Sequence, residues 1–471
     1  MDKKLILVTG ATGYIASRLI PKLLERGYRV RCLVRQSLRL RNRTWFPFVE
    51  VVHGDVMDLL TLAPAMDGVH TAYYLVHNMS SGQGYTSLEL SGARYFASAA
   101  EQAGVEHIIY LGGLADPKGK IAAHLRSRIE TGERLRSGIV PVTEFRAGVI
   151  VGPGSISFEM IRFMTELLPV IIGPGWLQNM SQPIAAQNVI DYLVAALDNI
   201  AGQGKIFEIG GPDRMSYANL MLTYGRLRGL QRNLVTLPGI PLWFMAMGVA
   251  GMTPVPAEIA RPLVDGLQSD SIVQDDAAQR TFPYIRLLGY EEGVNIALDQ
   301  LRPDRLEPAW MDCEQLVKFM KHEGFFIDHR CVEVDATPEK VFQVVTALGG
   351  KNGWLYANWL WRLRGWLDRL FGGPGMRGRL EGLQVKDIVD FYCVEAIEEG
   401  RLLRLYSELK APGEGWMEWR VETEDEVTRL SQTGFFAPHG FWGFAYWILF
   451  YPFHRLVFSG LVGAIVRQSE A

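Results

Sequence analysis

The sequence predicts a doubly wound parallel α/β sheet in its first 303 residues and a smaller α+β domain at its C-terminal end. Three observations support this fold class. Apolar strand-length runs alternate with helical segments over the first 150 residues, and a glycine-rich turn joins the first strand to the first helix. After residue 330 the pattern changes to paired strands and a long apolar segment. A chain of 471 residues is also too long for one ordinary core.

The N-terminal elements are expected in strict alternation. The first strand lies in residues 3–10, an apolar run that ends in a glycine. Residues 14–26 have helical spacing and stop at Gly27, which is typical of a helix C-terminus, while Pro21 predicts a local bend. A further helix is expected at 87–103. The remaining strands are expected at 28–35, 48–55, 69–78, 106–113 and 141–155.

The rest of the chain divides into three parts. Residues 157–303 mix helices with short strands and complete the first domain, 1–303. Within them, residues 252–267 contain three prolines and are expected to form a substrate-side or lid element. Residues 304–329 are predicted as a linker. Residues 330–471 form the second domain, with a strand, turn and helix at 329–350, antiparallel strands within 389–410 and 415–436, and a closing helix.

Two apolar segments of the second domain raise the question of membrane contact. Residues 440–453 are uncharged but shorter than the ~18–20 residues of a membrane span, and Pro452 interrupts them before a second run at 456–466. A buried helix is therefore expected, with peripheral membrane contact left open. The tryptophan-rich segment 353–373 predicts an amphipathic helix over the core. The alternatives are a lid over an apolar ligand and an interfacial helix.

Composition and cysteine spacing narrow the function classes. A net charge of −3 and a pI near 6.3 do not favour nucleic acid. The N-terminal apolar run ends after one strand length, so no signal peptide is expected and a cytoplasmic location is predicted, with membrane association left open. No metal site is expected. Four separate thiols in a reducing compartment are predicted for Cys32, Cys313, Cys331 and Cys393.

The turn "TGATGYIASRL" at residues 9–19 predicts a dinucleotide site. Gly10 permits the tight turn, Gly13 lets the backbone approach a pyrophosphate, and Ala16 allows close packing of helix on strand. The N–H groups and the dipole at the start of the helix attract the negative charge. The segment therefore predicts a Rossmann-type cofactor domain.

The end of the second strand favours NADP(H), while NAD stays open. An NAD site usually places an acid there, whereas this strand ends at Arg35 and is followed by Arg39, Arg41 and Arg43. A guanidinium suits a 2′-phosphate through paired hydrogen bonds. The alternative is a solvated basic loop. Asp55, after the third strand, is a candidate contact on the adenine side.

Several separated blocks resemble a known family. "GATGYIASRL", "YYLVHNM", "YLGGL", "HLRSR", "FRAGVIVGPGSISFEMIR" and "QPIAAQNVIDYL" resemble an atypical, NmrA-like branch of the extended short-chain dehydrogenases/reductases. This branch is akin to the Rossmann-type accessory subunit of respiratory complex I. The resemblance covers about residues 1–300 and departs at Asn188, where the family more often has Asp. It implies that residues 146–149 pass near the nicotinamide.

Together, the glycine-rich turn and this resemblance give a set of expected cofactor contacts. They are Gly10, Thr12, Gly13, Tyr14, Ile15, Arg35, Asp55, Val56, Leu75, Val76, His77, Leu111, Gly112, Ala147 and Gly148.

The C-terminal segments resemble a domain that follows such reductases. "HEGFFIDHRCVEVDATPEKVF" and "YWILFYPFH" are similar in pattern to the START/polyketide-cyclase helix-grip fold. That resemblance implies an apolar cavity between a curved antiparallel sheet and a long helix.

The usual catalytic set of this reductase family is missing. The serine position reads Gly112-Gly113, and His124 and Arg128 stand where a tyrosine and a lysine are expected. Residues four apart share one helix face, so both side chains can face the cofactor. His124 is predicted as an acid/base near neutral pH and Arg128 as a ribose- or phosphate-binding cation. The alternative is that both only pack, and His77 is a secondary candidate.

Tyr73, Tyr74 and Tyr110 are expected in the core of the sheet rather than as proton donors.

The sequence therefore predicts an NADP(H)-binding atypical short-chain oxidoreductase. Its substrate is expected to be a hydrophobic small molecule, such as a quinone, an isoprenoid or a polyketide-like compound, held partly by the second domain. The alternative is a non-catalytic cofactor-binding scaffold or redox sensor that acts through a protein partner. The oligomeric state stays open.

Overall fold

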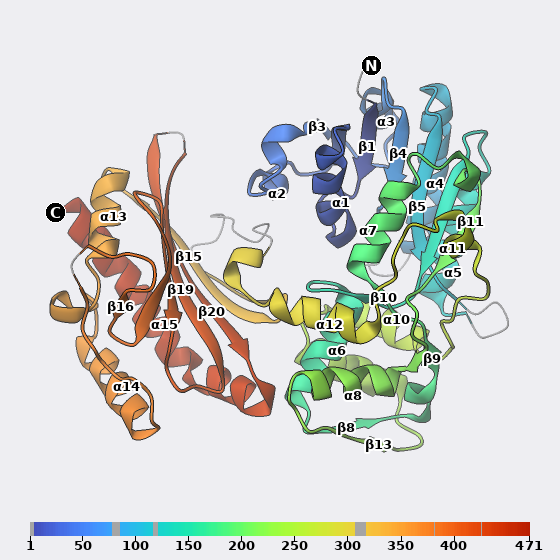
Figure 1. Cartoon of the computed structure of the whole chain (residues 1–471). Helices are drawn as coiled ribbons and strands as arrows, with labels where there is room; N and C mark the ends of the chain where they lie inside the picture. Colours follow the sequence, from blue (N-terminus) through green and yellow to red (C-terminus); the bar gives the residue numbers. More distant parts are fainter. Residues whose placement is uncertain (1–3, 78–84, 116–120, 307–316, 381, 425) are drawn as a thin grey trace. The chain divides into compact units, whose positions relative to one another are not determined.

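The computed structural model describes residues 4–77, 85–115, 121–306, 317–380, 382–424 and 426–471. The chain forms two compact units (Figure 1). Unit 1 comprises Met1–Thr165, Pro169–Gln300 and Glu307–Trp310. Unit 2 comprises Glu166–Leu168, Leu301–Leu306 and Met311–Ala471.

Unit 1 is built on a seven-stranded parallel sheet in the order β11-β6-β5-β4-β1-β2-β3. β1 and β5 are buried along their whole length because helices cover both faces of the sheet. The doubly wound prediction is confirmed. The order reverses beside β1, which pairs with both β2 and β4, and ligands bind at such a switch point. The strands are β1 Leu5–Thr9, β2 Arg29–Val34, β3 Glu50–His53, β4 Thr71–Tyr74, β5 His107–Gly113, β6 Val142–Ala147 and β11 Ile206–Ile209.

The alternation of side chains along β1 divides the core of unit 1 into two layers. Ile6 and Val8 belong to one apolar cluster, whereas Leu5 and Leu7 belong to another. The helices of unit 1 are α1 Tyr14–Glu25, α2 Leu38–Arg41, α3 Leu59–Met66, α4 Tyr85–Gln102, α5 Ala123–Arg136, α6 Ile156–Leu167, α7 Ala186–Ala195, α8 Tyr217–Leu227, α9 Leu242–Met252, α10 Ala257–Gly266, α11 Ala277–Thr281 and α12 Tyr290–Asp299.

The strand expected at 141–155 is two strands. β6 ends at Ala147, and the chain then leaves the sheet to form β7 (Ile150–Val151), which pairs with β10 (Ile184–Ala185). A separate parallel pair, β8 (Val170–Gly173) with β13 (Asn233–Thr236), lies at the bottom of unit 1 in Figure 1. The pair β9 (Met180–Ser181) with β12 (Met215–Ser216) is antiparallel.

Unit 2 contains an antiparallel seven-stranded sheet in the order β14-β15-β20-β19-β18-β17-β16. The core contains Trp354, Trp361 and Trp419. The α+β prediction for this part of the chain is confirmed. Its elements are β14 Val317–His322, β15 Phe325–Val334, α13 Pro338–Thr346, α14 Asn358–Leu370, β16 Ile388–Val389, β17 Tyr392–Glu398, β18 Leu402–Ser407, β19 Gly413–Glu424, β20 Val427–Pro438 and α15 Gly440–Glu470.

The linker predicted at 304–329 is wrong over its second half. β14 and the start of β15 form a hairpin there, and Phe325, Phe326 and Ile327 are buried. Burial of these apolar side chains against the sheet makes this stretch part of unit 2 rather than a connection.

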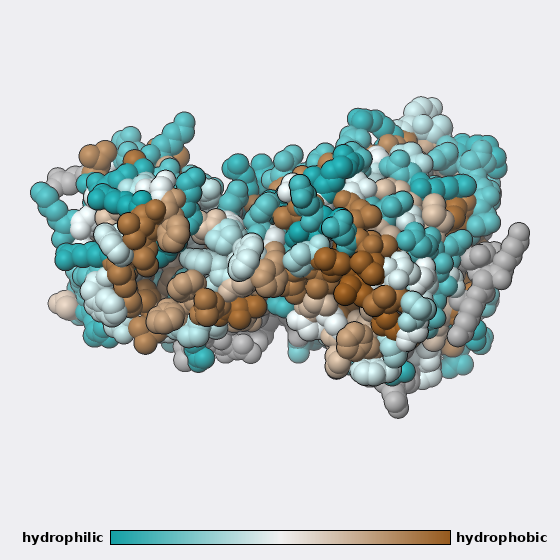
Figure 2. Space-filling model, turned by 90° about the horizontal axis from the view of Figure 1, so that it is seen from below, coloured by the Kyte–Doolittle hydropathy of each residue, from teal (hydrophilic) through white to brown (hydrophobic). Residues whose placement is uncertain are grey.

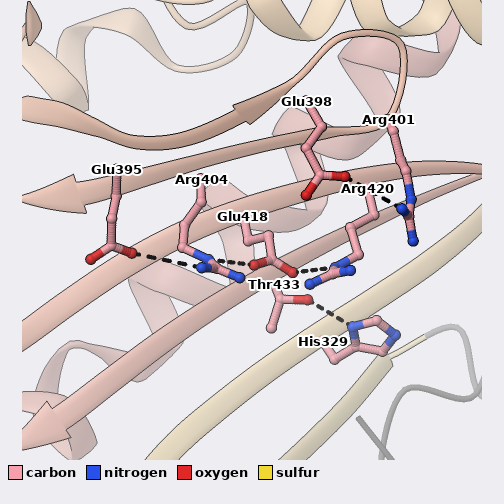
Figure 3. Close-up of polar contacts among 8 residues, drawn as sticks. All are labelled: His329, Glu395, Glu398, Arg401, Arg404, Glu418, Arg420 and Thr433. Atoms are coloured by element: carbon pink, nitrogen blue, oxygen red, sulfur yellow. Dashed lines mark hydrogen bonds and ion pairs between the residues drawn. The ribbon is translucent and has the colours of Figure 1, made fainter. Parts of the chain in front are cut away.

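A row of charges crosses the sheet of unit 2 (Figure 3). Buried Arg404 on β18 donates to Glu418 on β19 at 2.6 Å, and the second oxygen of Glu418 accepts from Arg420 at 2.6 Å. Glu395 on β17 lies 3.9 Å from Arg404. On neighbouring strands, His329 and Thr433 share a hydrogen bond of 2.9 Å. These cross-strand contacts favour one register of β17–β20.

The cysteine prediction is wrong for Cys331, which is disulfide-bonded. Cys32 and Cys393 are free thiols, as expected, and burial raises the pKa of Cys32 to about 12. Cys313 lies outside the described residues.

The two C-terminal apolar runs form one helix, α15, despite Pro452. Among the described residues, α15 is the one helix whose length and composition would suffice to cross a membrane. Leu461 and Ile465 nevertheless belong to the core of unit 2, and α15 contacts β15 and β20 of the sheet. The helix therefore has a buried face of the kind expected from the sequence.

Candidate functional site

The glycine-rich turn of unit 1 has the geometry of a phosphate cradle. Gly10 adopts φ +69°, and a Cβ built on it would lie 2.6 Å from the carbonyl oxygen of Leu75. The N–H of Gly13 donates to the Gly10 carbonyl at 2.8 Å. Gly13 is also the N-cap of α1, and no side chain caps this helix start. The close backbone approach and the helix start fit a bound pyrophosphate.

Thr9 holds the two strands at the switch point in register. Its hydroxyl donates to the Tyr73 carbonyl at 2.9 Å and accepts from the Leu75 N–H at 3.1 Å. The end of β4, which carries the predicted contacts Leu75, Val76 and His77, is thereby fixed beside the turn. Because this bond is buried, breaking it would leave polar groups unpaired.

Two arginines after β2 lie near the cradle. Arg35 is 75% exposed, and its Nη1 lies 3.9 Å from Oδ2 of Asp55. Arg43 is buried, and its Nη2 lies 3.5 Å from the carbonyl oxygen of Thr12 in the turn. The side chain of Arg39 lies outside the description. Arg43 therefore stands beside the turn, and the NADP(H) preference stays a prediction.

The predicted contacts Asp55 and Val56 have structural partners. Asp55 Oδ1 accepts from the Met57 N–H at 3.0 Å, which shapes the turn after β3. Val56 is buried in one of the two core layers of unit 1. Their contact with a cofactor stays a prediction.

A cavity of about 270 Å³ opens in unit 1 at the carboxyl ends of β5 and β6. Its wall is mostly apolar, with Met160, Met164, Met221, Met245, Trp176 and Leu177 among its members. The predicted cofactor contacts Tyr14, Leu111, Gly112, Ala147 and Gly148 also line it. The wall of the cavity therefore extends to α1, where the phosphate cradle begins.

His124 and Arg128 both face this cavity from α5, as their spacing predicts. His124 is 5% exposed and packs against Gly266 of α10, where a built Cβ would lie 2.6 Å from its Cε1. Burial and the positive charge of Arg128 lower the pKa of His124 to about 3. A lowered pKa disfavours a charged imidazole near neutral pH, and the acid/base role of His124 stays a prediction.

His77 also lies in the electrostatic field of Arg128. Burial, and secondly the charge of Arg128, hold the pKa of His77 well below its usual range. Arg128 is thus a permanent cation beside two neutral imidazoles. Such a site stabilises negative charge and offers no titrating histidine near neutral pH at these two positions.

The structure explains the absence of a serine at Gly112-Gly113. A Cβ on Gly113 would lie 2.7 Å from Leu125 Cδ2 and 3.1 Å from Arg128 Cδ, so α5 packs directly over this glycine. Tyr110 is buried, as expected, and its hydroxyl donates to the Arg128 carbonyl at 2.9 Å. At Gly113 the space for a serine side chain is therefore taken by Leu125 and by the stem of Arg128.

A serine introduced at residue 113 is expected to lower the stability of the protein without adding activity. In Gly113→Ser, the new Cβ must displace Leu125 or the Arg128 stem, and overpacking of this kind costs about 1–3 kcal/mol. We expect a lower unfolding midpoint in urea and no new activity. Gly138→Ser is the control, because a Cβ there meets nothing closer than 3.6 Å. A gain of ketone-reductase activity in Gly113→Ser would contradict this explanation.

Buried ion pairs that sequence patterns did not reveal hold α5 in place. Glu144 on β6 is fully buried, contacts Arg136 of α5 and accepts from Arg146 Nε at 2.6 Å. Near the start of α5, Ser127 donates to buried Glu89 of α4. These contacts orient α5, the helix that carries His124 and Arg128. Periodicity along the chain does not indicate pairs such as Ser127 with Glu89, which lie on different helices.

The proline-rich segment 252–267, expected as a substrate-side or lid element, contributes to the wall of the cavity. Leu263, Val264 and Leu267 line the cavity from α10 and its end. α9 was not singled out from the sequence, although its Met245 and Val249 line the cavity too. The uncharged, apolar sequence of α9, LWFMAMGVAGM, is the signal that could have indicated its place in the cavity wall.

Unit 2 has a small cavity of about 80 Å³ between its sheet and α15, next to His454 and Tyr446. Pockets for drug-sized ligands are typically about 300–1,000 Å³. The second domain was expected to hold the apolar part of the substrate. This cavity is smaller than such pockets and does not support that role.

The two units are similar to different families. Residues 2–151 match the NmrA-like family, and residues 322–461 match a family described as a protein of unknown function (DUF2867). The first part of unit 1 is therefore similar to NmrA-like proteins, and the fold of unit 1 is a doubly wound Rossmann-type sheet. The relation to the complex I accessory subunit and the START-like resemblance stay predictions.

Individual relatives agree with this classification. A (4-alkanoyl-5-oxo-2,5-dihydrofuran-3-yl)methyl phosphate reductase of Streptomyces griseus is 28% identical over 59% of this chain and 88% of its own. The Citrobacter sp. triphenylmethane reductase complexed with NADP(H) has TM-score 0.51 and 21% identity over 62% of this chain and 99% of its own. The Escherichia coli quinone oxidoreductase QOR2 complexed with NADPH has TM-score 0.51 and 17% identity over the same shares.

These structural likenesses concern the fold. The first three curated relatives are matched over 34%, 56% and 35% of their own length.

Proposed function

We propose that unit 1 is an NADP(H)-dependent reductase of hydrophobic, conjugated small molecules such as quinones. The observation that carries this proposal is an apolar cavity with Arg128 in its wall, in the same unit as an intact phosphate cradle. NADPH bound at the cradle supplies a hydride. Gly10, Gly13 and the start of α1 would hold its pyrophosphate, and Arg35 and Arg43 would offer guanidinium groups to a 2′-phosphate.

The chemistry of the cavity indicates the kind of acceptor. A simple ketone becomes a strongly basic alkoxide on hydride transfer and needs a proton donor at that moment. Neutral His124 is a weaker proton donor than an imidazolium, and the serine and tyrosine of related enzymes are missing. A quinone instead becomes a delocalised hydroquinone anion, which Arg128 stabilises until solvent supplies the proton. Acceptors that delocalise the incoming charge therefore fit this site best.

The test is oxidation of NADPH by the purified protein with a panel of acceptors. Quinones and enals are expected to be reduced, and saturated ketones of similar size are not. The similar structures are named for a quinone and for triphenylmethane dyes, which are conjugated acceptors of this kind. Equal turnover of saturated ketones and quinones would contradict the argument from the missing proton donor.

The second candidate is a cofactor-binding scaffold or redox sensor. The lowered pKa of His124 favours this candidate too, because it leaves the imidazole neutral near pH 7. Tight NADPH retention without turnover of any acceptor, together with a co-purifying protein, would favour it over the reductase.

Cofactor preference is expected to depend on Arg35. A charge-assisted hydrogen bond to a phosphate contributes about 1.5–3 kcal/mol, so Arg35→Ala is expected to weaken NADPH binding about 10- to 100-fold and leave NADH binding unchanged. Calorimetric titration with both cofactors measures this. Arg26→Ala is the control, since Arg26 is a half-exposed arginine that pairs with Asp198. Tighter binding of NADH than NADPH by the wild type would contradict the assignment.

A further inference from the structure

Unit 2 has a helix whose apolar stripe faces away from its own core. Trp359, Leu363, Trp366, Leu367 and Leu370 of α14 are exposed at spacings of one helix face. Trp359 is 65% and Trp366 is 57% exposed. The helix covers the core through its opposite face, where Trp361, Gly365 and Asp368 are buried. An amphipathic helix that only covered a core would bury its apolar stripe instead.

The first half of α15 has a second stripe of this kind. Trp442 is 72%, Leu449 69%, Phe453 58% and Leu456 54% exposed. Their spacings of seven, four and three residues place them on one face of the helix. The opposite face, with Phe444 and Trp447, is buried.

The two helices adjoin. Arg364 of α14 donates to the Tyr446 hydroxyl of α15 at 3.5 Å, and a Cβ built on Gly460 of α15 would touch the ring of Tyr356, just before α14. Figure 2 shows hydrophobic residues gathered on this unit, at the left. We call this the aromatic surface, represented by Trp359, Trp366, Phe371, Trp442, Leu449 and Phe453. Apolar patches of this extent mark interaction sites.

The exposed charges on α14 and on the first half of α15 are positive. Arg362, Arg369 and Arg455 are exposed. α14 and α15, both described in full, contain two acidic residues. Asp368 is buried and accepts from Gly375 and Lys410 N–H groups, and Glu470 lies at the far end of α15.

We propose that unit 2 docks on an anionic membrane surface through the aromatic surface. Tryptophan and phenylalanine beside arginine are the residues that interfacial helices present to lipid. The absence of exposed acids from α14 and from the first half of α15 suits anionic headgroups. α15 lies in the plane of the interface rather than across the bilayer, because its other face is part of the protein core. The proposal concerns unit 2 and is independent of the reductase activity.

Flotation with lipid vesicles tests the proposal. The full chain is mixed with phosphatidylcholine vesicles, with and without phosphatidylglycerol. We expect binding to the anionic vesicles that weakens as salt rises. Trp359→Ala with Trp366→Ala is expected to reduce binding at least about tenfold. Arg362→Gln is expected to reduce it about fivefold.

A control variant of unit 1 and a measurement of folding make the flotation result interpretable. Phe48→Ala with Tyr284→Ala removes two exposed aromatic side chains of unit 1 and is expected to bind like the wild type. Circular dichroism checks that each variant is folded. No binding of the wild type to either vesicle, or equal binding of the tryptophan variant, overturns the proposal. A dimer in light scattering that the tryptophan variant dissociates would instead assign the surface to a second copy of the chain.

Discussion

Arg128→Met is expected to lower the turnover number with a quinone acceptor by about 10²–10³-fold. The methionine keeps the apolar stem that packs over Gly113 but removes the cation from the cavity wall. Negative charge that develops on the acceptor is then left in an apolar space, where electrostatic interactions are stronger than in water. The loss therefore belongs to the transition state and appears in kcat more than in KM.

Single-turnover oxidation of NADPH measures this loss. Arg126→Met is the matched control, because Arg126 is exposed on the same helix and is absent from the cavity wall. Arg128→Lys is expected to recover part of the rate, since it restores the charge without the fork geometry. Since His124 stays neutral above about pH 3, the rate is expected to show no inflection from it near neutral pH. An unchanged rate in Arg128→Met would remove Arg128 from the mechanism.

Gly10→Ala is expected to abolish measurable NADPH binding, with an affinity loss of at least about 100-fold. The new Cβ would lie 2.6 Å from the oxygen and 2.9 Å from the carbon of the Leu75 carbonyl, and both atoms belong to the backbone at the end of β4. The left-handed backbone at φ +69° adds about 1–2 kcal/mol of strain. The turn must therefore move away from β4, which destroys the cradle.

Gly27→Ala is the control that separates the effect of the steric clash at Gly10 from the effect of a positive φ angle. Gly27 also has a positive φ, +83°, but a Cβ there meets nothing within 4 Å. This variant is expected to lose about 1 kcal/mol of stability and to bind NADPH normally. Fluorescence titration with NADPH and urea unfolding of both variants measure the two effects. Normal NADPH binding by Gly10→Ala would contradict the assigned cradle.

The sequence predicts the fold of unit 1 well because its signals are local. β1 is a fully buried apolar run, and the turn at Gly10 has the spacing that a strand–turn–helix unit requires. The spacing of His124 and Arg128 also placed both on the cavity side of α5. These features depend on neighbours in the chain, which periodicity reveals.

The errors concern contacts between distant residues. The lowered pKa of His124 arises from burial against α10, more than a hundred residues away in the chain. The need for glycine at 113 comes from the packing of α5. The apolar stripe of α14 faces solvent. An apolar stripe that packs against a core has the same periodicity, so only the packed structure tells which face of the helix is exposed.

The most direct test of the central claim is the absorbance of reduced nicotinamide after NADPH and a hydrophobic quinone are mixed with the purified full chain. The account predicts saturable oxidation of NADPH that is faster than oxidation of NADH and is nearly lost in Arg128→Met. Retention of NADPH without oxidation across the whole quinone panel, or a rate that Arg128→Met leaves unchanged, would contradict it.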